Sequence, residues 1–364
     1  MLGVTAVLAD GSILTELSGL VAGSSGYDLA QLLTGREGTL AVITAARLRL
    51  WPADPVAAVL LAGVAGIEPA AELCQRLRAN VPGLRAAEYL DAASLELVCQ
   101  AAKLPAPLDD SHRGYLLAEI AGDGPDGTAL DLKRLVRAAL PSDTALAQDG
   151  RGQAALWAYR ERLTEAIATA GIPHKIDVAV PAAALGAFRA ELDEVVRAAA
   201  RRSDPAADRP DPAADRPGPA AGSDPPGGRP DARRSDLLGG RSDPPGRSPG
   251  PPGRRSGQSD RRSGSPDPAA DPQVIVFGHI GVGNLHVNVL GPDPADDAVD
   301  VAVARLAAAH GGSVAAEHGV GRAKTGWLSL SRSPAEISAM RAIKTALDPA
   351  GLLNPGVLLP PGSG

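Results

Sequence analysis

Two histidines, His279 and His286, bracket a glycine-rich turn between the apolar runs 274–277 and 287–290. Two short β-branched runs separated by a Gly/Asn cluster are typical of a β-hairpin. A turn around 281–284 would bring both imidazoles onto one face, where they could share a metal ion. The alternative is a hairpin whose two histidines are solvated or belong to the core.

Three more polar residues belong to the same hairpin or to the apolar stretch 313–321. Because side chains alternate along a strand, Asn288 should lie on the face of His286. Glu317 and His318 lie in a stretch that is predicted to be a strand running into a glycine turn. Neighbours in a strand face opposite ways, so one of this pair could serve a metal while the other faces a substrate.

A second group of residues could bind a carboxylate. The sequence pattern predicts a helix over 153–170 that places Arg160 and Thr164 on one face. It then predicts a strand that places Lys175 and Asp177 on one face. An arginine can hold a carboxylate through two parallel hydrogen bonds. The alternative is a pair of solvated cations.

The elements that would position these residues alternate between strand and helix. Strands are predicted at 56–64 and 115–120, and helices at 67–80, 92–102 and 126–140. This order indicates an α+β fold in which an antiparallel sheet carries helices on one face.

The two ends of the chain carry patterns of their own. Segment 4–17 is predicted to be a hairpin and 46–50 a strand. Between them, glycines flank Glu37, and such a loop lets the backbone approach a ligand closely. The alternative is an ordinary turn before a strand. A capping box at Ser333–Glu336 predicts a helix that runs to about Leu347.

The composition narrows the class of protein. The chain has 364 residues, 44% of them hydrophobic, and a formal net charge of −6, which does not indicate nucleic-acid binding. Cys74 and Cys99 have no metal-type spacing, so buried thiols in a reducing compartment are expected. No apolar run is long enough to span a bilayer and no signal peptide is visible. We therefore expect a cytoplasmic protein, or one peripheral to the inner membrane.

The segment 201–272 differs in kind from the rest. It contains 13 Arg and 11 Asp but no Lys, Glu, aromatic residue, Ile or Val. Such a composition cannot bury enough apolar area to offset about 1–2 kcal/mol per residue of backbone ordering. We expect a disordered insertion. The near balance of Arg and Asp argues against a dedicated nucleic-acid tail.

Several phrases of the sequence resemble the flavin-dependent D-2-hydroxy-acid dehydrogenases of the vanillyl-alcohol-oxidase-like FAD superfamily. Their order and spacing make the match specific, and they span nearly the whole chain outside 201–272. The matching phrases are Ser25–Leu29, Gly35–Leu40, Trp157–Glu161, Lys175–Val178, Gly278–Asn288, Glu317–Gly319, Leu347–Pro349 and Asn354–Gly356. At Val282 the family carries Asp, so a carboxylate that supports the metal ligands could be missing.

The resemblance implies a role for each matching residue. His279, His286 and Glu317 match the ligands of a divalent metal, usually zinc or manganese. His318 matches the base beside the flavin and a substrate contact. The other substrate contacts would be Arg160, Thr164, Lys175 and Asn288, and the FAD contacts would be Gly26, Gly35, Glu37, Gly38, Thr39, Ile43 and Asn354.

The implied reaction is FAD-dependent oxidation of a D-2-hydroxy acid, such as D-lactate, glycolate or D-2-hydroxyglutarate, to the 2-oxo acid. Hydride would leave C2 for the flavin while the metal lowers the pKa of the hydroxyl group and His318 takes its proton. The electron acceptor would be a quinone, an electron-transfer flavoprotein or a partner subunit.

The resemblance also implies a domain organisation. It comprises the C-terminal portion of an FAD domain (1–54), two parts of a substrate or cap domain (55–200 and 273–332), the insertion (201–272), and a helix and tail that return to the FAD domain (333–364). The family's FAD domain begins with a glycine-rich pyrophosphate-binding half that has no match here. The alternative function is therefore a non-catalytic or partner-dependent fragment, completed in a homodimer or by another subunit. A zinc hydrolase is disfavoured because no HExxH helix is present.

Overall fold

The computed structural model describes residues 1–17, 25–51, 55–122, 132–203 and 271–360. Most of the predicted insertion lies outside the described residues. The strands are β1 Gly3–Val7, β2 Ile13–Glu16, β3 Val42–Arg47, β4 Val56–Val64, β5 Leu84–Asp91, β6 Gly114–Ala121, β7 Thr144–Ala147, β8 His174–Ala179, β9 Gln273–His279 and β10 Asn284–Leu290. The helices are α1 Leu29–Leu33, α2 Ile67–Asn80, α3 Ala92–Ala102, α4 Leu132–Arg137, α5 Gly150–Glu161, α6 Leu163–Ala170, α7 Leu185–Ser203, α8 Ala298–Ala309, α9 Leu328–Ser331 and α10 Pro334–Leu347, with 3-10 turns η1 Ala182–Ala184, η2 Ile280–Val282 and η3 Thr325–Trp327.

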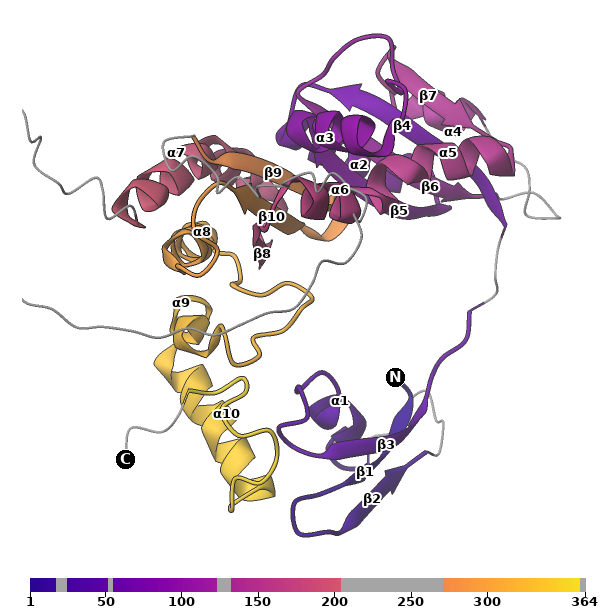
Figure 1. Cartoon of the computed structure of the whole chain (residues 1–364). Helices are drawn as coiled ribbons and strands as arrows, with labels where there is room; N and C mark the ends of the chain where they lie inside the picture. Colours follow the sequence, from indigo (N-terminus) through magenta and orange to yellow (C-terminus); the bar gives the residue numbers. More distant parts are fainter. Residues whose placement is uncertain (18–24, 52–54, 123–131, 204–270, 361–364) are drawn as a thin grey trace, which may run out of the picture. The chain divides into compact units, whose positions relative to one another are not determined.

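The described strands form a three-stranded and a seven-stranded antiparallel sheet (Figure 1). The order in the larger sheet is β7-β4-β6-β5-β9-β10-β8. The predicted hairpin around the glycine turn is confirmed as β9 and β10, joined through η2 and Gly283. Gly283 has φ +71°, and a Cβ there would lie 2.1 Å from the carbonyl oxygen of Val180. Only glycine fits this turn, which fixes the register of the hairpin.

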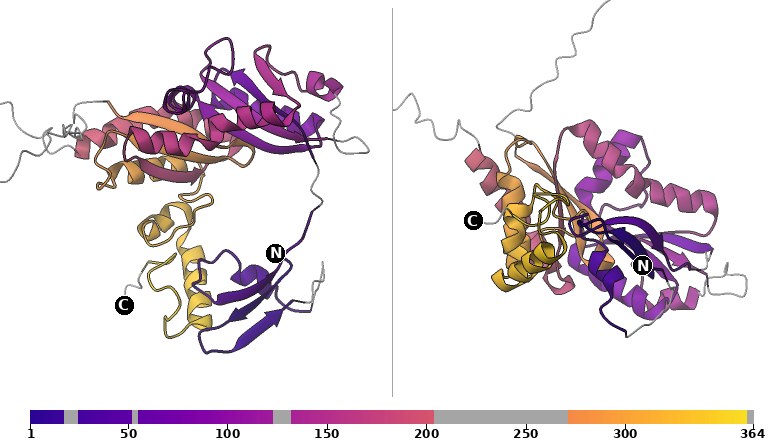
Figure 2. Two further views of the ribbon diagram at one scale, coloured as in Figure 1. Left: turned by 45° about the vertical axis from the view of Figure 1, so that its right-hand side comes forward. Right: turned by 90° about the horizontal axis from the view of Figure 1, so that it is seen from below.

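Helices lie on both faces of the larger sheet (Figure 2), and apolar side chains pack against each face. One cluster joins Leu60 and Leu116 of the sheet to α2, α4, α7 and α8. The other joins Leu61 and Leu117 to α3, α5 and α6. The predicted α+β class is confirmed, but the prediction that helices cover one face is wrong. β4 and β6 are buried at almost every position rather than alternately, which is the pattern of strands covered on both sides.

The smaller sheet, in the order β2-β1-β3, has its own core. The hairpin predicted at 4–17 is confirmed as β1 and β2, whereas the strand predicted at 46–50 begins earlier, at β3. Pairing of Val42 with Val7 sets its start. The predicted capping box is present at the start of α10, where Ser333 and Glu336 exchange hydrogen bonds, and Leu347 packs against the core of the smaller sheet.

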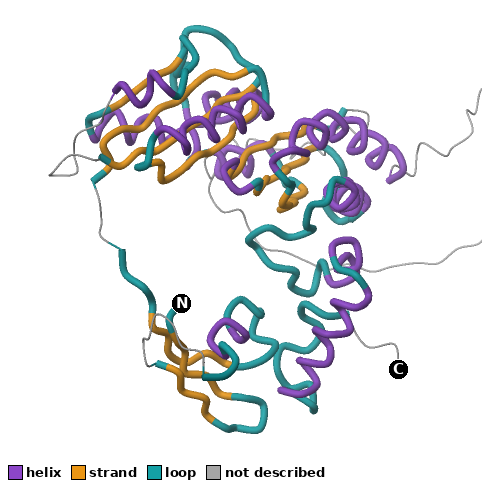
Figure 3. The backbone as a smooth tube through the Cα atoms, turned by 180° about the vertical axis from the view of Figure 1, so that it is seen from behind, coloured by secondary structure: helices purple, strands orange, loops and turns teal. Residues whose placement is uncertain are grey.

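Three other predicted elements take a different form. The helix predicted over 153–170 is divided at Arg162 into α5 and α6. Of the helix predicted at 126–140, α4 is described and residues up to 131 lie outside the described part. The stretch 313–321 is a loop rather than a strand (Figure 3), and only Ser313 pairs, in an isolated bridge with Ala179. None of the described helices is long and apolar enough to cross a membrane.

Candidate active site

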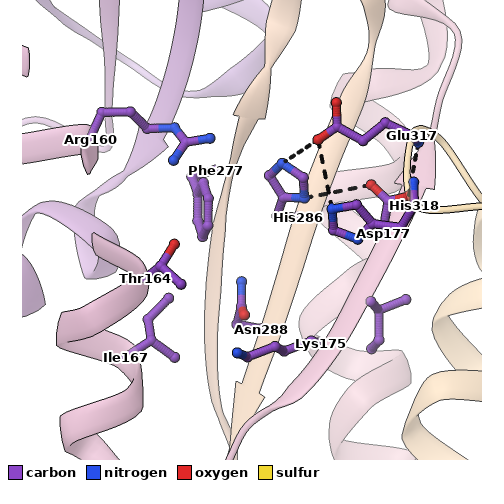
Figure 4. A pocket seen from close by; sticks show the side chains of 11 residues that line it. Arg160, Thr164, Ile167, Lys175, Asp177, Phe277, His286, Asn288, Glu317 and His318 are labelled. Carbon is purple, nitrogen blue, oxygen red and sulfur yellow. Dashed lines mark hydrogen bonds and ion pairs between the residues drawn. The ribbon is translucent and has the colours of Figure 1, made fainter. Parts of the chain in front are cut away.

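The residues predicted to bind substrate gather around a cavity of about 350 Å³ on the α6 side of the larger sheet (Figure 4). The side chains come from α5, α6, β8, β9, β10 and the loop after α8. They are Arg160, Thr164, Ile167, Lys175, Ile176, Asp177, Phe277, His286, Asn288, Glu317 and His318. The structure thus brings together all the predicted substrate contacts and two of the three predicted metal ligands. The third, His279, lines a neighbouring cavity that shares Arg160.

Strand pairing places four of these side chains on one surface. His286 of β10 lies opposite Asp177 of β8, and Asn288 lies opposite Lys175. Because every second residue of a strand faces the same way, both pairs point into the cavity. The alternation seen in the sequence is sufficient to explain this part of the site.

The three predicted metal ligands converge. Nε2 of His279 lies 3.5 Å from Oε2 of Glu317, and Nε2 of His286 lies 3.3 Å from Oε1. Each spacing is close to the roughly 3.3–3.6 Å that separates two ligand atoms around a tetrahedral zinc ion, and the two imidazoles face different oxygens of Glu317. Burial lowers the pKa of His286, which favours the neutral imidazole that a metal requires.

Each of the two imidazoles has a buried carboxylate near its Nδ1 atom. Nδ1 of His279 makes a short hydrogen bond to Glu88, whose side chain is 5% exposed. Nδ1 of His286 lies 3.5 Å from Oδ1 of Asp177, an oxygen that is buried without a hydrogen-bond partner among the described residues. Carboxylates in this position orient metal-binding histidines so that Nε2 faces the ion. Glu88 of β5 and Asp177 of β8 therefore occupy the positions that a supporting carboxylate would take, where Val282 provides none.

The sequence reasoning did not identify Glu88. It lies on β5, whose contacts with β9 place it opposite His279 although the two residues are 191 positions apart. Its signal in the sequence is an acidic residue directly before an apolar pair, Tyr89 and Leu90. That pattern alone does not distinguish a buried acid from one at the end of an exposed strand.

Asp177 also organises the loop that carries Glu317 and His318. Its Oδ2 accepts hydrogen bonds from three backbone N–H groups, those of Ala316 (2.9 Å), Glu317 (3.0 Å) and His318 (3.2 Å). Burial alone would raise the pKa of Asp177, but these backbone donors lower it below its usual value. These three hydrogen bonds to one carboxylate hold residues 316–318 in a loop conformation rather than in a strand.

As a result, both residues of this pair face the cavity. The prediction that a strand would turn Glu317 and His318 to opposite faces is wrong. The imidazole of His318 stacks on that of His286, with centroids 5.5 Å apart, and its Nε2 lies 3.8 Å from Oε1 of Glu317. His318 is the more accessible imidazole, with 64% of its side chain exposed against 13% for His286. Its imidazole is therefore accessible to a substrate.

Arg160 is held in place from two sides. Its Nε donates to Oε2 of Glu88 at 2.7 Å, and its guanidinium lies 4.6 Å from the ring centroid of Phe277. The terminal nitrogens remain directed toward the cavity, with Thr164 one helical turn further on (Figure 4). Glu88 thus contacts both Arg160, which is predicted to bind the substrate carboxylate, and His279, a predicted metal ligand.

The residues predicted to line FAD divide into two groups. Nδ2 of Asn354 donates to the carbonyl oxygen of Glu37 at 2.5 Å. A Cβ on Gly38 would lie 2.8 Å from the same Nδ2, so the loop and Asn354 form one packed unit. Gly35 and Thr39 belong to this unit by sequence, and Nζ of Lys344 donates to the carbonyl oxygen of Thr39 at 2.8 Å. The other group comprises Gly26, in a bend before α1, and Ile43, on the exposed strand β3.

A second set of possible metal ligands is present. One ligand atom from each of Asp177, His286, Glu317 and His318 lies within 4.8 Å of the others. In this set Asp177 accepts three backbone hydrogen bonds through Oδ2, and its Oδ1 has no partner among the described residues. His279 is not part of this set, so Asp177 and His279 are alternative third ligands.

Comparison with known protein families gives one match over most of the chain. Residues 53–203 and 266–358 match the family described as FAD linked oxidases, C-terminal domain. The two matched segments include every residue that lines the cavity. The unmatched segment between them lies within the predicted insertion.

Curated relatives match over almost the whole chain. D-2-hydroxyglutarate dehydrogenase of Bos taurus, a mitochondrial protein, is 30% identical over 99% of this chain and 54% of its own length. D-2-hydroxyglutarate dehydrogenase of Xanthomonas citri pv. viticola is 30% identical over 98% of this chain and 62% of its own. An uncharacterized FAD-linked oxidoreductase of Mycobacterium tuberculosis is 28% identical over 98% and 64%. The chain therefore spans a little over half the length of the relatives it matches.

A solved structure shares the fold. The substrate-bound crystal structure of p-cresol methylhydroxylase aligns with a TM-score of 0.56 at 11% identity. The alignment covers 98% of this chain and 65% of the other. The chain therefore shares its fold with this enzyme.

Proposed function

The chain belongs to the family of FAD linked oxidases, C-terminal domain, and from this premise we propose that it serves the FAD-dependent oxidation of a D-2-hydroxy acid to the 2-oxo acid. The proposal rests on one observation, which is that groups able to bind a carboxylate and groups able to bind a metal or accept a proton line the same cavity. Arg160 and Lys175 supply cationic donors for a carboxylate, and His286, Glu317 and His318 supply metal-binding and proton-accepting groups beside them. The D-2-hydroxyglutarate dehydrogenases among its relatives act on a substrate of this class.

The proposed roles follow from the geometry of the side chains. Arg160, fixed by Glu88, binds the substrate carboxylate with its terminal nitrogens, and Lys175 adds a point charge. Thr164 and Asn288 can donate neutral hydrogen bonds that fix the orientation of the substrate. His318, accessible and stacked on His286, takes the proton of the C2 hydroxyl group.

His279, His286 and Glu317 would hold the divalent cation, zinc or manganese. Their spacing and the carboxylates behind both imidazoles support this assignment. When bound, the cation would supply Lewis-acid chemistry and FAD would supply the hydride acceptor. The loop containing Gly35, Glu37, Gly38 and Thr39, together with Asn354, would line the flavin. The final electron acceptor would be a quinone, an electron-transfer flavoprotein or a partner subunit.

Replacement of His318 tests the proposed reaction. We expect His318→Ala to abolish reduction of bound flavin by D-lactate, glycolate and D-2-hydroxyglutarate, while the metal content measured by mass spectrometry stays at the wild-type value. Glu119→Gln is the matched control, because Glu119 accepts a bond from the neutral Nε1 of Trp157. Loss of the metal in His318→Ala would contradict its assignment as the base and would favour the second ligand set.

A second candidate is a substrate- and metal-binding part that requires a further polypeptide to bind FAD. The share of its relatives that the chain spans, 54% and 62%, favours considering it. A colourless purified protein that binds about one metal ion would support this candidate. A yellow protein whose colour bleaches with a D-2-hydroxy acid would support the first.

A further inference from the structure

Glu37 inserts its carboxylate into the loop that carries Glu317 and His318. Its Oε1 accepts a hydrogen bond from the backbone N–H of Val320 at 2.9 Å, and its Oε2 accepts one from Gly321 at 2.7 Å. Gly319 has φ +76°, and a Cβ there would lie 2.9 Å from the carboxylate. The loop therefore wraps around this carboxylate, as backbone amides do in anion-binding nests.

The position of Glu37 is itself fixed. Its own backbone has φ +52°, which is unusual for a residue with a side chain, and Asn354 donates to its carbonyl oxygen. Gly38 leaves room for the Asn354 amide. The carboxylate is thus presented from a tightly hydrogen-bonded unit rather than from a free loop.

The loop that bears the metal and proton-accepting groups is held by two carboxylates. Asp177 accepts the N–H groups of residues 316, 317 and 318, and Glu37 accepts those of residues 320 and 321. Hydrogen bonds from backbone N–H groups to a charged acceptor are stronger than those between neutral groups. Glu317 and His318 belong to the segment held by Asp177, and only residue 319 separates this segment from the one held by Glu37. Glu37 therefore fixes the chain directly after the two side chains that face the cavity.

We propose that Glu37 is a positioning residue for the metal and proton-accepting groups, which it serves by fixing residues 319–321. This inference rests on the proposed function for its consequence, since the loop matters to catalysis only if Glu317 binds a metal. Each carboxylate oxygen of Glu37 accepts one backbone hydrogen bond from this loop. The residue that the family resemblance assigns to FAD would therefore also join the loop 35–39 to the loop that carries Glu317 and His318.

Glu37→Gln tests the proposal with almost no change of shape. An amide can accept only one of the two backbone hydrogen bonds, and its NH₂ group would face the other N–H. We expect the affinity for Zn²⁺ and Mn²⁺, measured by chelator competition on the full chain, to fall about tenfold, as for other groups that orient metal ligands. We expect amide hydrogen exchange in the metal-free protein to accelerate in residues 316–327 and to stay unchanged in β8 and β10. Glu194→Gln on α7 removes the same charge elsewhere and should alter neither measurement.

Two results would overturn the proposal. One is exchange in residues 316–327 that remains at the wild-type rate in Glu37→Gln. The other is acceleration spread equally over β8 and β10, which would show a general loss of stability. If the wild-type chain binds neither metal ion, the proposed metal site fails, and the exchange measurement still decides whether Glu37 holds the loop.

Discussion

Glu88 offers the sharpest test of how the candidate site is held together. This one buried carboxylate contacts Nε of Arg160 at 2.7 Å and Nδ1 of His279. Glu88→Gln keeps the volume but removes the charge. The amide oxygen can accept from one of the two donors, and the NH₂ group would then face the other. The substitution therefore disturbs either Arg160 or His279. It also weakens the hydrogen bond that the other of these two residues keeps.

The size of the effect follows from the burial of both partners. The side chain of Glu88 is 5% exposed and that of Arg160 17% exposed, so solvent screens the pair little. A hydrogen bond to a charged group contributes about 1.5–3 kcal/mol to stability, and the variant loses one. For a domain of this size, where 1 kcal/mol shifts the thermal midpoint by roughly 2–4 °C, the midpoint should then fall by roughly 3–12 °C. Support of a metal-binding histidine is worth roughly 10–100-fold in metal affinity, so Zn²⁺ binding should weaken by that factor.

Chelator competition and thermal unfolding measure the two effects on the same sample. Glu119→Gln is the control, because it lies on the neighbouring strand β6 and its partner, Trp157, is a neutral donor that an amide oxygen can still satisfy. We expect wild-type metal affinity for this control. A Glu88→Gln variant that loses stability but binds Zn²⁺ with wild-type affinity would refute the link between Glu88 and the metal ligand.

Three further predictions concern neighbouring groups. Asp177→Asn should lower metal affinity, measured by chelator competition, by roughly tenfold. Because backbone donors lower the pKa of Asp177 despite its burial, the wild type should also have a higher free energy of unfolding than this variant near neutral pH. That difference, measured by denaturant unfolding, should disappear as the pH falls below about 4. A hydrogen bond to Asp300 raises the pKa of His174, so the stability that Asp300→Asn removes should be fully present below about pH 6.5 and should diminish as the pH rises through the folded-state pKa. Arg160→Lys should weaken calorimetric binding of a 2-hydroxy acid by roughly tenfold or more, because lysine lacks the planar fork that binds Glu88 and a carboxylate together.

The parts of the site that lie on regular strands could be predicted from the sequence because their rules are local. His286 and Asn288 face the cavity through simple alternation, and so do Lys175 and Asp177. The glycine turn between His279 and His286 fixes which strands pair. The same local rules gave the ends of α2 and α3. They missed the division at Arg162, where the backbone keeps a helical conformation (φ −84°, ψ −6°) and no glycine or proline marks the boundary.

The rest of the site could not be predicted because it depends on carboxylates that act over long distances in the sequence. The stretch 313–321 reads as a strand by composition, yet no neighbouring strand pairs with it beyond Ser313 among the described residues. Its backbone N–H groups bond instead to Asp177 and Glu37, which lie 139–141 and 283–284 positions away. A buried acid that accepts several backbone N–H groups can replace strand pairing, because either arrangement satisfies the donors. The polar residues that shape this site are therefore found by asking which donors a predicted strand would leave unpaired.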